Sequence, residues 1–330
     1  MSTEHYLVTG GTGCIGAWVV RNLVQAEIST TVLDFDQDYH RLELILDENE
    51  LSQVKFIAGD INRLDDLIQI FEENYITKVI HLAALQLPFC KANPSLGALV
   101  NVVGTINIFE AAKRTGVRHI VYASSGAVYG PKEIYKIDPI PHEAPLFPTS
   151  HYGVYKQANE LGAKVYWKND SISSIGLRPH VVYGPGRDQG MTSTPTKAML
   201  AAIIGRPYTV SFDGRYCVQY VDDAAKVFIR ASQTAFDGAD VFNIGGEAPS
   251  STAIIREIEI AIPSISGKLD TKSFVLPFPE DFDNGALKAI LGYFQQTSLR
   301  EGVQQTIKIY KLALQKGCIK QSQIDNILSS

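Results

Sequence analysis

Short apolar runs alternate with longer segments of helical spacing along the first half of the chain. The apolar runs are residues 5–9, 30–33, 54–58, 78–83 and 119–123, and the helical patterns between them are 15–25, 64–73 and 96–114. Apolar runs without a polar face are typical of strands that are buried on both sides of a sheet. This alternation predicts an α/β fold, with a doubly wound parallel sheet that helices cover on both faces.

The pattern becomes looser in the second half. A helical segment that begins near residue 152 leads to one more strand, 174–178, and the stretch 183–211 is rich in Gly, Pro and Thr around one helix, 195–204. The apolar runs 217–221 and 241–244 are predicted to return to the main sheet, and 297–316 is predicted to be a closing helix. We therefore expect a main domain of residues 1–183, with a return near 215–245, and a smaller C-terminal lobe built mostly from residues 184–330.

Composition and charge exclude several classes of protein. The 330 residues are 45% hydrophobic and 20% charged, with a net charge of −5, which is ordinary for a globular enzyme. The chain has no block of Lys and Arg that would attract nucleic acid, and apolar runs such as 198–204 are too short to cross a membrane. The first residues lead into a strand rather than a signal segment. The four scattered cysteines argue against a zinc site or a disulfide framework, and we expect a cytoplasmic protein.

A glycine turn directly follows the first predicted strand. Gly10, Gly13 and Gly16 form a GxxGxxG pattern that opens a helix and encloses Cys14 and Ile15. Such a turn lets the backbone approach a pyrophosphate, and the helix N-terminus supplies N–H groups to it. The sequence therefore predicts a Rossmann-type fold that binds a dinucleotide.

Two carboxylates are predicted to select the nucleotide. Asp34 ends the second strand, where a carboxylate accepts hydrogen bonds from the adenosine ribose and repels a 2′-phosphate. Because no arginine adjoins Asp34, we expect NAD rather than NADP as the cofactor. Asp36 could share this role. Asp60 and Ile61 could bracket the adenine, although Asp60 is equally compatible with a plain turn.

A tyrosine and a lysine are spaced by one helical turn near the middle of the chain. Tyr152 and Lys156 are neighbours on a helix, and an ammonium beside a phenol is expected to lower the phenol pKa. Such a tyrosine can exchange a proton with a substrate hydroxyl while a nicotinamide exchanges a hydride. Ser124 and Ser125 end the strand 119–123 and could bind the substrate oxygen, although Ser-Ser-Gly is also common turn chemistry.

The order of these motifs resembles the extended short-chain dehydrogenase/reductase family, in its NAD-dependent epimerase/dehydratase branch. The resemblance covers residues 5–310 and also rests on the segments 81–84, 101–105, 183–186 and 243–246. It implies that Tyr152 is the general acid and base, that Lys156 holds the nicotinamide ribose, and that Ser125 orients the substrate. It further implies that cofactor contacts come from Leu82, Ala83, Ala84, Asn101, Ser124, Pro179, Val181 and Val182.

Other implications of the resemblance concern the substrate and assembly. Gln86, Ser125 and Arg215 are expected to contact a small hydroxylated substrate, and the helices 96–114 and 153–166 are expected to form a homodimer contact. Asn101 could instead be a helix N-cap.

The chain also departs from the family pattern. Val181 replaces an asparagine that binds the sugar diphosphate in nucleotide-sugar members, and the loop 274–289 lacks their arginine, which leaves Arg215 as the clear anion partner. Gly126 and Ala127 replace the acid pair of the dehydratases, which disfavours that reaction. The sequence therefore favours oxidation of a secondary alcohol in a sugar-like or hydroxy-acid substrate, through a keto product or intermediate. A UDP-hexose type 4-epimerase and a non-catalytic NAD-binding redox regulator remain as alternatives.

Overall fold

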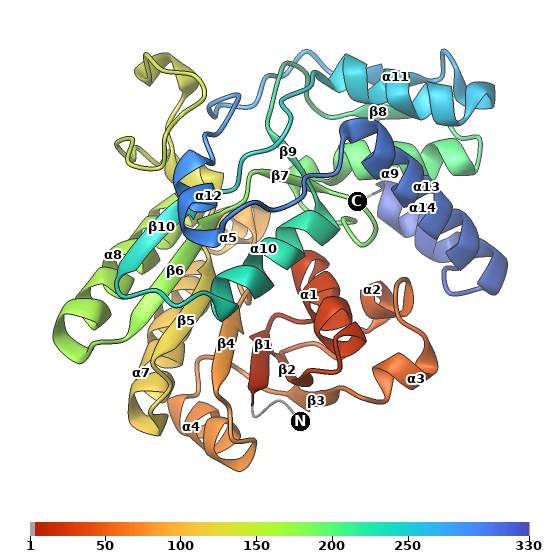
Figure 1. Ribbon diagram of the computed structural model, residues 1–330. Helices are drawn as coiled ribbons and strands as arrows, with labels where there is room; N and C mark the ends of the chain where they lie inside the picture. The colour runs from red at the N-terminus through yellow and green to blue at the C-terminus, as the bar shows by residue number, and fades with distance from the viewer. Residues whose placement is uncertain (1–3, 330) are drawn as a thin grey trace.

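A seven-stranded parallel sheet forms the centre of the protein (Figure 1). The structure is a computed structural model that describes residues 4–329. In spatial order the strands are β10 (Ala239–Asn243), β6 (Ser173–Arg178), β5 (His119–Ala123), β4 (Lys78–His81), β1 (His5–Thr9), β2 (Ser29–Asp34) and β3 (Lys55–Ala58). The chain builds outward from β1 to β3 and then crosses back to β4. The reversal creates a crevice at the carboxyl ends of β1 and β4, where open α/β sheets bind ligands. The predicted doubly wound fold is confirmed.

Both faces of the sheet are buried. Tyr6 and Val8 of β1 belong to one apolar cluster, and Leu7, between them, belongs to the cluster on the opposite face. The first cluster includes residues of α1 (Cys14–Gln25), α10 (Val221–Gln233) and α12 (Gly285–Leu291). The second includes residues of α4 (Leu64–Glu73), α7 (Gly104–Thr115) and α8 (His151–Asp170). This burial explains why the strands read as continuous apolar runs.

One long helical segment is interrupted by a π-helical turn. The predicted helix 96–114 comprises α6 (Pro94–Ala98), η1 (Leu99–Val103) and α7. The remaining elements of the first half are short and follow strand ends: α2 (His40–Glu43), α3 (Glu48–Leu51), α5 (Leu87–Ala92), η2 (Gly126–Val128) and η3 (Lys132–Ile134).

A smaller layer of elements lies beyond the carboxyl ends of the strands (Figure 1). Its strands form two parallel pairs, β7 (Val181–Tyr183) with β9 (Val218–Tyr220) and β8 (Tyr208–Val210) with β11 (Leu269–Thr271). Its helices are η4 (Met191–Ser193), α9 (Thr194–Ile203), α11 (Ser251–Ala261), η5 (Pro263–Ile265), α13 (Leu299–Lys316) and α14 (Gln321–Ser329). Buried residues of β7, β9, α9, α11 and α13 form one apolar cluster that gives this layer a core of its own.

The two predicted returns to the main sheet have different outcomes. The run 241–244 does return, because β10 pairs with β6 along its whole length. The prediction for 217–221 is wrong, because β9 pairs with β7 outside the main sheet. The chain leaves that sheet at Pro179, which has no N–H to continue the ladder, and β7 then provides a separate edge for β9.

Candidate active site

The glycine turn packs its backbone closely against the start of α1. Gly10 has a φ of 71°, which L side chains rarely adopt, and a Cβ on Gly16 would lie 2.1 Å from the Gly10 carbonyl oxygen. Gly13 is the N-cap of α1, and no side chain caps this helix end. The N–H groups at the start of α1 are therefore left for a ligand, and a dinucleotide pyrophosphate fits this donor set.

Asp34 is fixed beside this turn by Thr12. The Thr12 N–H and hydroxyl donate to Asp34 Oδ2 at 3.0 and 2.6 Å, and the Phe35 N–H donates to Oδ1 at 2.9 Å. An ionised carboxylate has further lone pairs, so Asp34 can still accept from ribose hydroxyls. Thr12 was not singled out from the sequence, although its place inside the glycine turn is a signal for this contact.

A long groove crosses the carboxyl ends of the strands from Asp34 to Lys156. It encloses about 650 Å³. Of the residues predicted to contact cofactor, the groove is lined by Gly10, Gly13, Cys14, Ile15, Gly16, Asp34, Asp60, Ile61, Leu82, Ala83, Ala84, Ser124, Tyr152, Lys156 and Pro179. Val181 and Val182 instead line an adjoining pocket. The groove thus brings together residues that are up to 169 positions apart in the predicted set (Gly10 to Pro179).

Asn101 lies behind the groove rather than on its wall. Its side chain accepts from the Leu85 N–H at 2.7 Å and donates to the Leu85 carbonyl at 2.9 Å, so it holds the segment that follows β4. Asn101 is buried inside the π-helical turn, which rules out the alternative that it is an N-cap. Asn101 would therefore affect cofactor binding indirectly, by positioning the backbone of residues 82–86.

Tyr152 and Lys156 lie together at the inner end of the groove. Lys156 Nζ is 5.7 Å from the centre of the Tyr152 ring and donates to the Ala123 carbonyl at 2.7 Å. Burial lowers the pKa of Lys156 to about 8, against the opposing charges of Cys90 and Glu160. Burial also raises the pKa of Tyr152, while hydrogen bonding to Ser125 and the charge of Arg187 act in the lowering direction. The pKa of Tyr152 is thus raised rather than lowered as predicted, because desolvation outweighs nearby charge.

The two serines at the end of β5 have different partners. Ser125 Oγ accepts from the Ala127 N–H at 3.1 Å and faces a pocket that Tyr152 also lines. Ser124 is buried and donates to Glu160, whose carboxylate also accepts from Arg178 Nε at 2.8 Å and Nη2 at 2.7 Å. Because Glu160 lies one turn after Lys156 on α8, this buried network ties the serine strand end to the catalytic helix.

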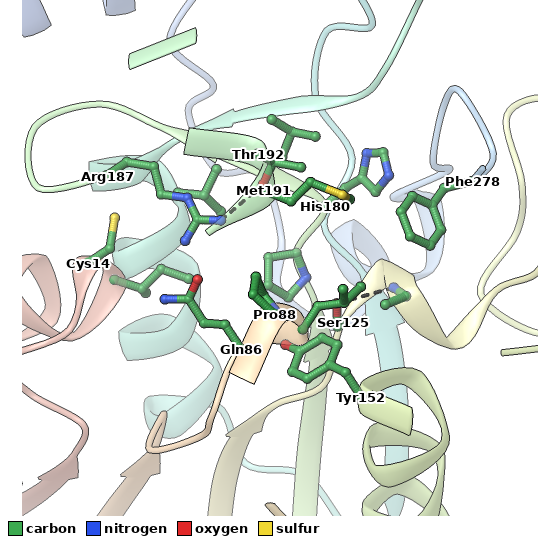
Figure 2. A pocket seen from close by; sticks show the side chains of 16 residues that line it. Cys14, Gln86, Pro88, Ser125, Tyr152, His180, Arg187, Met191, Thr192 and Phe278 are labelled. Carbon is green, nitrogen blue, oxygen red and sulfur yellow. Dashed lines mark hydrogen bonds between the residues drawn. The ribbon is translucent and has the colours of Figure 1, made fainter. Parts of the chain in front are cut away.

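A pocket of about 160 Å³ adjoins the inner end of the groove (Figure 2). Tyr152 and Ser125 lie between Arg187 and Gln86 at one end and His180 and Phe278 at the other. The structure brings the predicted Gln86 and Ser125 to this pocket, but not Arg215. The Arg215 side chain is exposed and donates to the Ala248 carbonyl at 3.2 Å, and the Arg215 backbone forms an isolated bridge with Ser250.

Two arginines that sequence reasoning missed lie in the groove. Arg187 also lines the pocket, and Arg41 lies on α2 near Asp34. Arg41 is engaged: its Nη2 lies 2.7 Å from Asp188 Oδ1, and it also donates to the carbonyls of Thr12 and Gly186. An arginine held in this way is not free for a 2′-phosphate. One sequence feature could have pointed to Arg187 as a site residue: it directly follows the Tyr-Gly-Pro-Gly turn after β7.

Comparison with known proteins agrees with this geometry. The model of the NAD dependent epimerase/dehydratase family matches residues 6–245. The chain belongs to this family. It is 32% identical over 318 residues to the UDP-glucose 4-epimerase of Mycolicibacterium smegmatis. The aligned region covers 92% of this chain and 98% of the relative.

Two solved enzyme structures show the same fold. A Thermus thermophilus UDP-glucose 4-epimerase in complex with NAD superposes with a TM-score of 0.80 at 24% identity, over 93% of this chain and 99% of the other. An L-threonine dehydrogenase from Cupriavidus necator has a TM-score of 0.81 at 21% identity, over 92% and 99%. As a member of the epimerase/dehydratase family, the chain is an NAD-dependent enzyme of the oxidoreductase or epimerase type. This membership leaves the non-catalytic regulator without support.

Proposed function

We propose that this enzyme oxidises a secondary alcohol of a small hydroxylated molecule, a free sugar, polyol or hydroxy acid, to a ketone that is a product or an intermediate. The observation that carries the proposal is that Tyr152 and Ser125 line one small pocket at the inner end of the NAD groove. The pocket and its position support a substrate alcohol held between these two hydroxyls and the cofactor.

Each residue of this group would have a distinct task. NAD, when bound, supplies a nicotinamide that can accept a hydride from the carbinol carbon. Tyr152 Oη would take the proton of the substrate hydroxyl, and Ser125 Oγ would hydrogen-bond the same oxygen as it becomes a carbonyl. The Lys156 ammonium, anchored on the Ala123 carbonyl, would stabilise the phenolate and hold the nicotinamide ribose.

The size and charge of the pocket favour a substrate without a nucleotide. The pocket encloses about 160 Å³, beside a groove of about 650 Å³ that the dinucleotide would occupy. Arg187 is the one charged side chain among the described residues that line it. A desolvated diphosphate needs several positive partners, and Val181 and Phe278 contribute apolar surface instead.

The second candidate function is a UDP-hexose type 4-epimerase, which the 32% identity to such an enzyme favours. A panel of free sugars, aldonates, alditols and UDP-hexoses with NAD separates the two. We expect NADH to accumulate with a small hydroxylated compound. Conversion of a UDP-hexose to its epimer at a comparable rate, without net NADH, would contradict the proposed substrate class.

We also propose that the enzyme is a homodimer, through exposed apolar side chains on two neighbouring helical segments. Leu99, Val103 and Ile106 project from η1 and α7, and Leu161 and Val165 project from α8, each between 40% and 59% exposed. The segment Pro94–Thr115 is apolar and long enough to cross a membrane, but half of its most apolar window is buried. A core helix has these properties, and a dimer contact would cover the exposed half.

We propose the cytoplasm as the location of the enzyme. Cys14, Cys90, Cys217 and Cys318 are all free thiols in the structure, as is usual in a reducing compartment.

A further inference from the structure

Arg187 lies where the NAD groove and the catalytic pocket meet. It lines both, and in Figure 2 its guanidinium extends toward the space above Gln86, on the Cys14 side of Tyr152. Its charge acts on Tyr152 in the direction that lowers the phenol pKa. Arg187 and Tyr152 therefore line one pocket, where the guanidinium charge can act on the proposed reacting group.

The Arg187 guanidinium has unused hydrogen-bonding capacity. Nη2 donates to Thr192 Oγ1 at 2.9 Å, while Nε is buried and has no partner within residues 4–329. None of the ion pairs in that range includes Arg187, and none of the described residues that line the catalytic pocket is acidic. A buried donor without a partner is costly, so a native structure that keeps one at a pocket indicates a ligand acceptor.

The loop that contains Arg187 is held in place by the next residue, Asp188. Asp188 is buried and takes both Arg41 and His40 as partners, with His40 Nε2 at 2.7 Å from Oδ2. These contacts engage both oxygens of the Asp188 carboxylate. The segment after β7 thus presents a fixed cation to the pocket and keeps the adjacent anion occupied elsewhere.

A second unpartnered group lies at the opposite end of the pocket. His180 Nδ1 donates to the Cys217 carbonyl at 3.1 Å, which leaves the buried Nε2 as an acceptor with no partner in the described chain. Burial lowers the pKa of His180 to about 4, so the ring is neutral at physiological pH. A neutral Nε2 can accept a hydrogen bond from a hydroxyl, but it cannot bind an anion.

We propose that Arg187 binds the carboxylate of the substrate, and that the pocket therefore takes a polyhydroxy acid. The carboxylate lies on Nε and Nη2 of Arg187 with help from Thr192, the reacting alcohol lies at Tyr152 and Ser125, and a further hydroxyl donates to His180 Nε2. A guanidinium edge and a carboxylate match in geometry as well as charge. This assignment rests on the proposed function and narrows its substrate class to acids.

Because Arg187 also lines the groove, the cofactor pyrophosphate is the competing anion. Four- to six-carbon aldonates and their matched alditols, which replace the carboxylate by a hydroxymethyl group, separate the two roles. Initial NADH formation gives kcat/KM for each pair, and fluorescence titration gives the NADH dissociation constant. Suitable pairs are erythronate with erythritol, xylonate with xylitol, gluconate with sorbitol and galactonate with galactitol.

We expect the unaltered enzyme to prefer an aldonate over its alditol. Arg187→Gln should lower kcat/KM for that aldonate by about 10- to 100-fold, the range for a hydrogen bond to a charged group. Its NADH dissociation constant should stay within about twofold. Arg187→Lys should recover part of the loss, since it keeps the charge without the fork. Arg206→Gln, which removes an exposed arginine paired with Asp325, is the matched control.

Three results would overturn the inference. Arg187→Gln could weaken NADH binding while the preference for acids persists, which would assign Arg187 to the pyrophosphate. Alditols or free sugars could be used as well as aldonates, with no effect of Arg187→Gln, which would overturn the assignment of Arg187 and leave the proposed oxidation intact. Absence of both NADH and an epimerised product with every compound would overturn the proposed function and this inference with it.

Discussion

Arg41 and Asp188, separated by 147 positions in the sequence, meet at 2.7 Å between Nη2 and Oδ1. Arg41 lies on α2 and also donates to the carbonyl of Thr12, inside the glycine turn. Asp188 lies on the loop after β7, between Arg187 and Gln189, which both line the groove. This ion pair therefore joins the proposed pyrophosphate site to the loop that carries the pocket cation.

Asp188→Asn should destabilise the enzyme substantially. Arg41 would lose its counter-charge in a site where both side chains are nearly buried, and breaking such a pair typically costs about 3 to 5 kcal/mol. Urea unfolding followed by fluorescence measures the change. The exposed pair of Arg206 with Asp325 offers the control, since Asp325→Asn should change the free energy of unfolding by about 1 kcal/mol or less. Equal effects of the two substitutions would show that the buried pair has no special role.

The same cluster should make stability depend on pH through His40. Asp188, the main cause, and Asp38 raise the pKa of His40 by hydrogen bonding, while burial and Arg41 oppose them. A raised folded-state pKa gives stability that is complete below the unfolded value of about 6.5 and is lost as the pH rises through the folded value. His40→Gln should therefore flatten the decline in unfolding free energy that begins above about pH 6.5. A decline as steep in the variant would remove His40 as its source.

Tyr152→Phe should abolish most turnover without weakening NAD binding. General acid–base catalysis is typically worth a factor of about 10² to 10⁴, and the ring itself is retained. Lys156→Met should lower both turnover and NAD affinity, because the lysine is proposed to contact the ribose as well as to stabilise the phenolate. Turnover rates and NADH dissociation constants of the two variants test whether the tyrosine affects turnover alone and the lysine affects both. Near-normal turnover of Tyr152→Phe would exclude the tyrosine from the mechanism.

Asp34 should make NAD bind more tightly than NADP. Its carboxylate is fixed by Thr12 at the end of β2, and Arg41, the nearby cation in the groove, is engaged by Asp188. Asp34→Ala should narrow the ratio of the two dissociation constants, mainly by removing repulsion of the 2′-phosphate. Competitive titration of NADH with NADPH measures the ratio. Equal binding of both by the unaltered enzyme would show that Asp34 does not select the cofactor.

Much of the cofactor groove could be predicted from local patterns. The glycine turn, Asp34 and the Tyr152–Lys156 spacing are each encoded within a few residues, and parallel strands bring their carboxyl ends to one edge. Arg41 and Arg187 could not be found in this way. Arg41 follows Asp34 by seven positions on a helix of four residues, and Arg187 lies in a loop without periodicity. Both are positioned by contacts between distant segments.

Two expectations from the sequence depend on features that local spacing does not encode. The family resemblance implies an anion-binding role for Arg215, whereas in the structure its side chain is exposed and its backbone forms a bridge with Ser250, 35 positions later. The Tyr152 pKa was predicted from the adjacent Lys156, but it is dominated by desolvation from the walls of the groove. Side-chain direction and burial are properties of the assembled structure, so spacing along one helix or strand is insufficient to predict them.

The ion pair between Glu160 and Arg178 has a consequence for how this chain can diverge. Glu160 also accepts a hydrogen bond from Ser124, and Arg178 Nη1 donates to the Tyr129 hydroxyl at 2.7 Å. Replacing either partner of the ion pair alone would therefore leave a buried, unpaired charge beside Ser124, the neighbour of the proposed catalytic Ser125. An apolar pair of similar volume could be tolerated, but only if both positions change together. Homologous sequences should therefore show correlated substitution at these two positions, and new substrate specificities should arise by changes at the pocket wall while this pair is inherited intact.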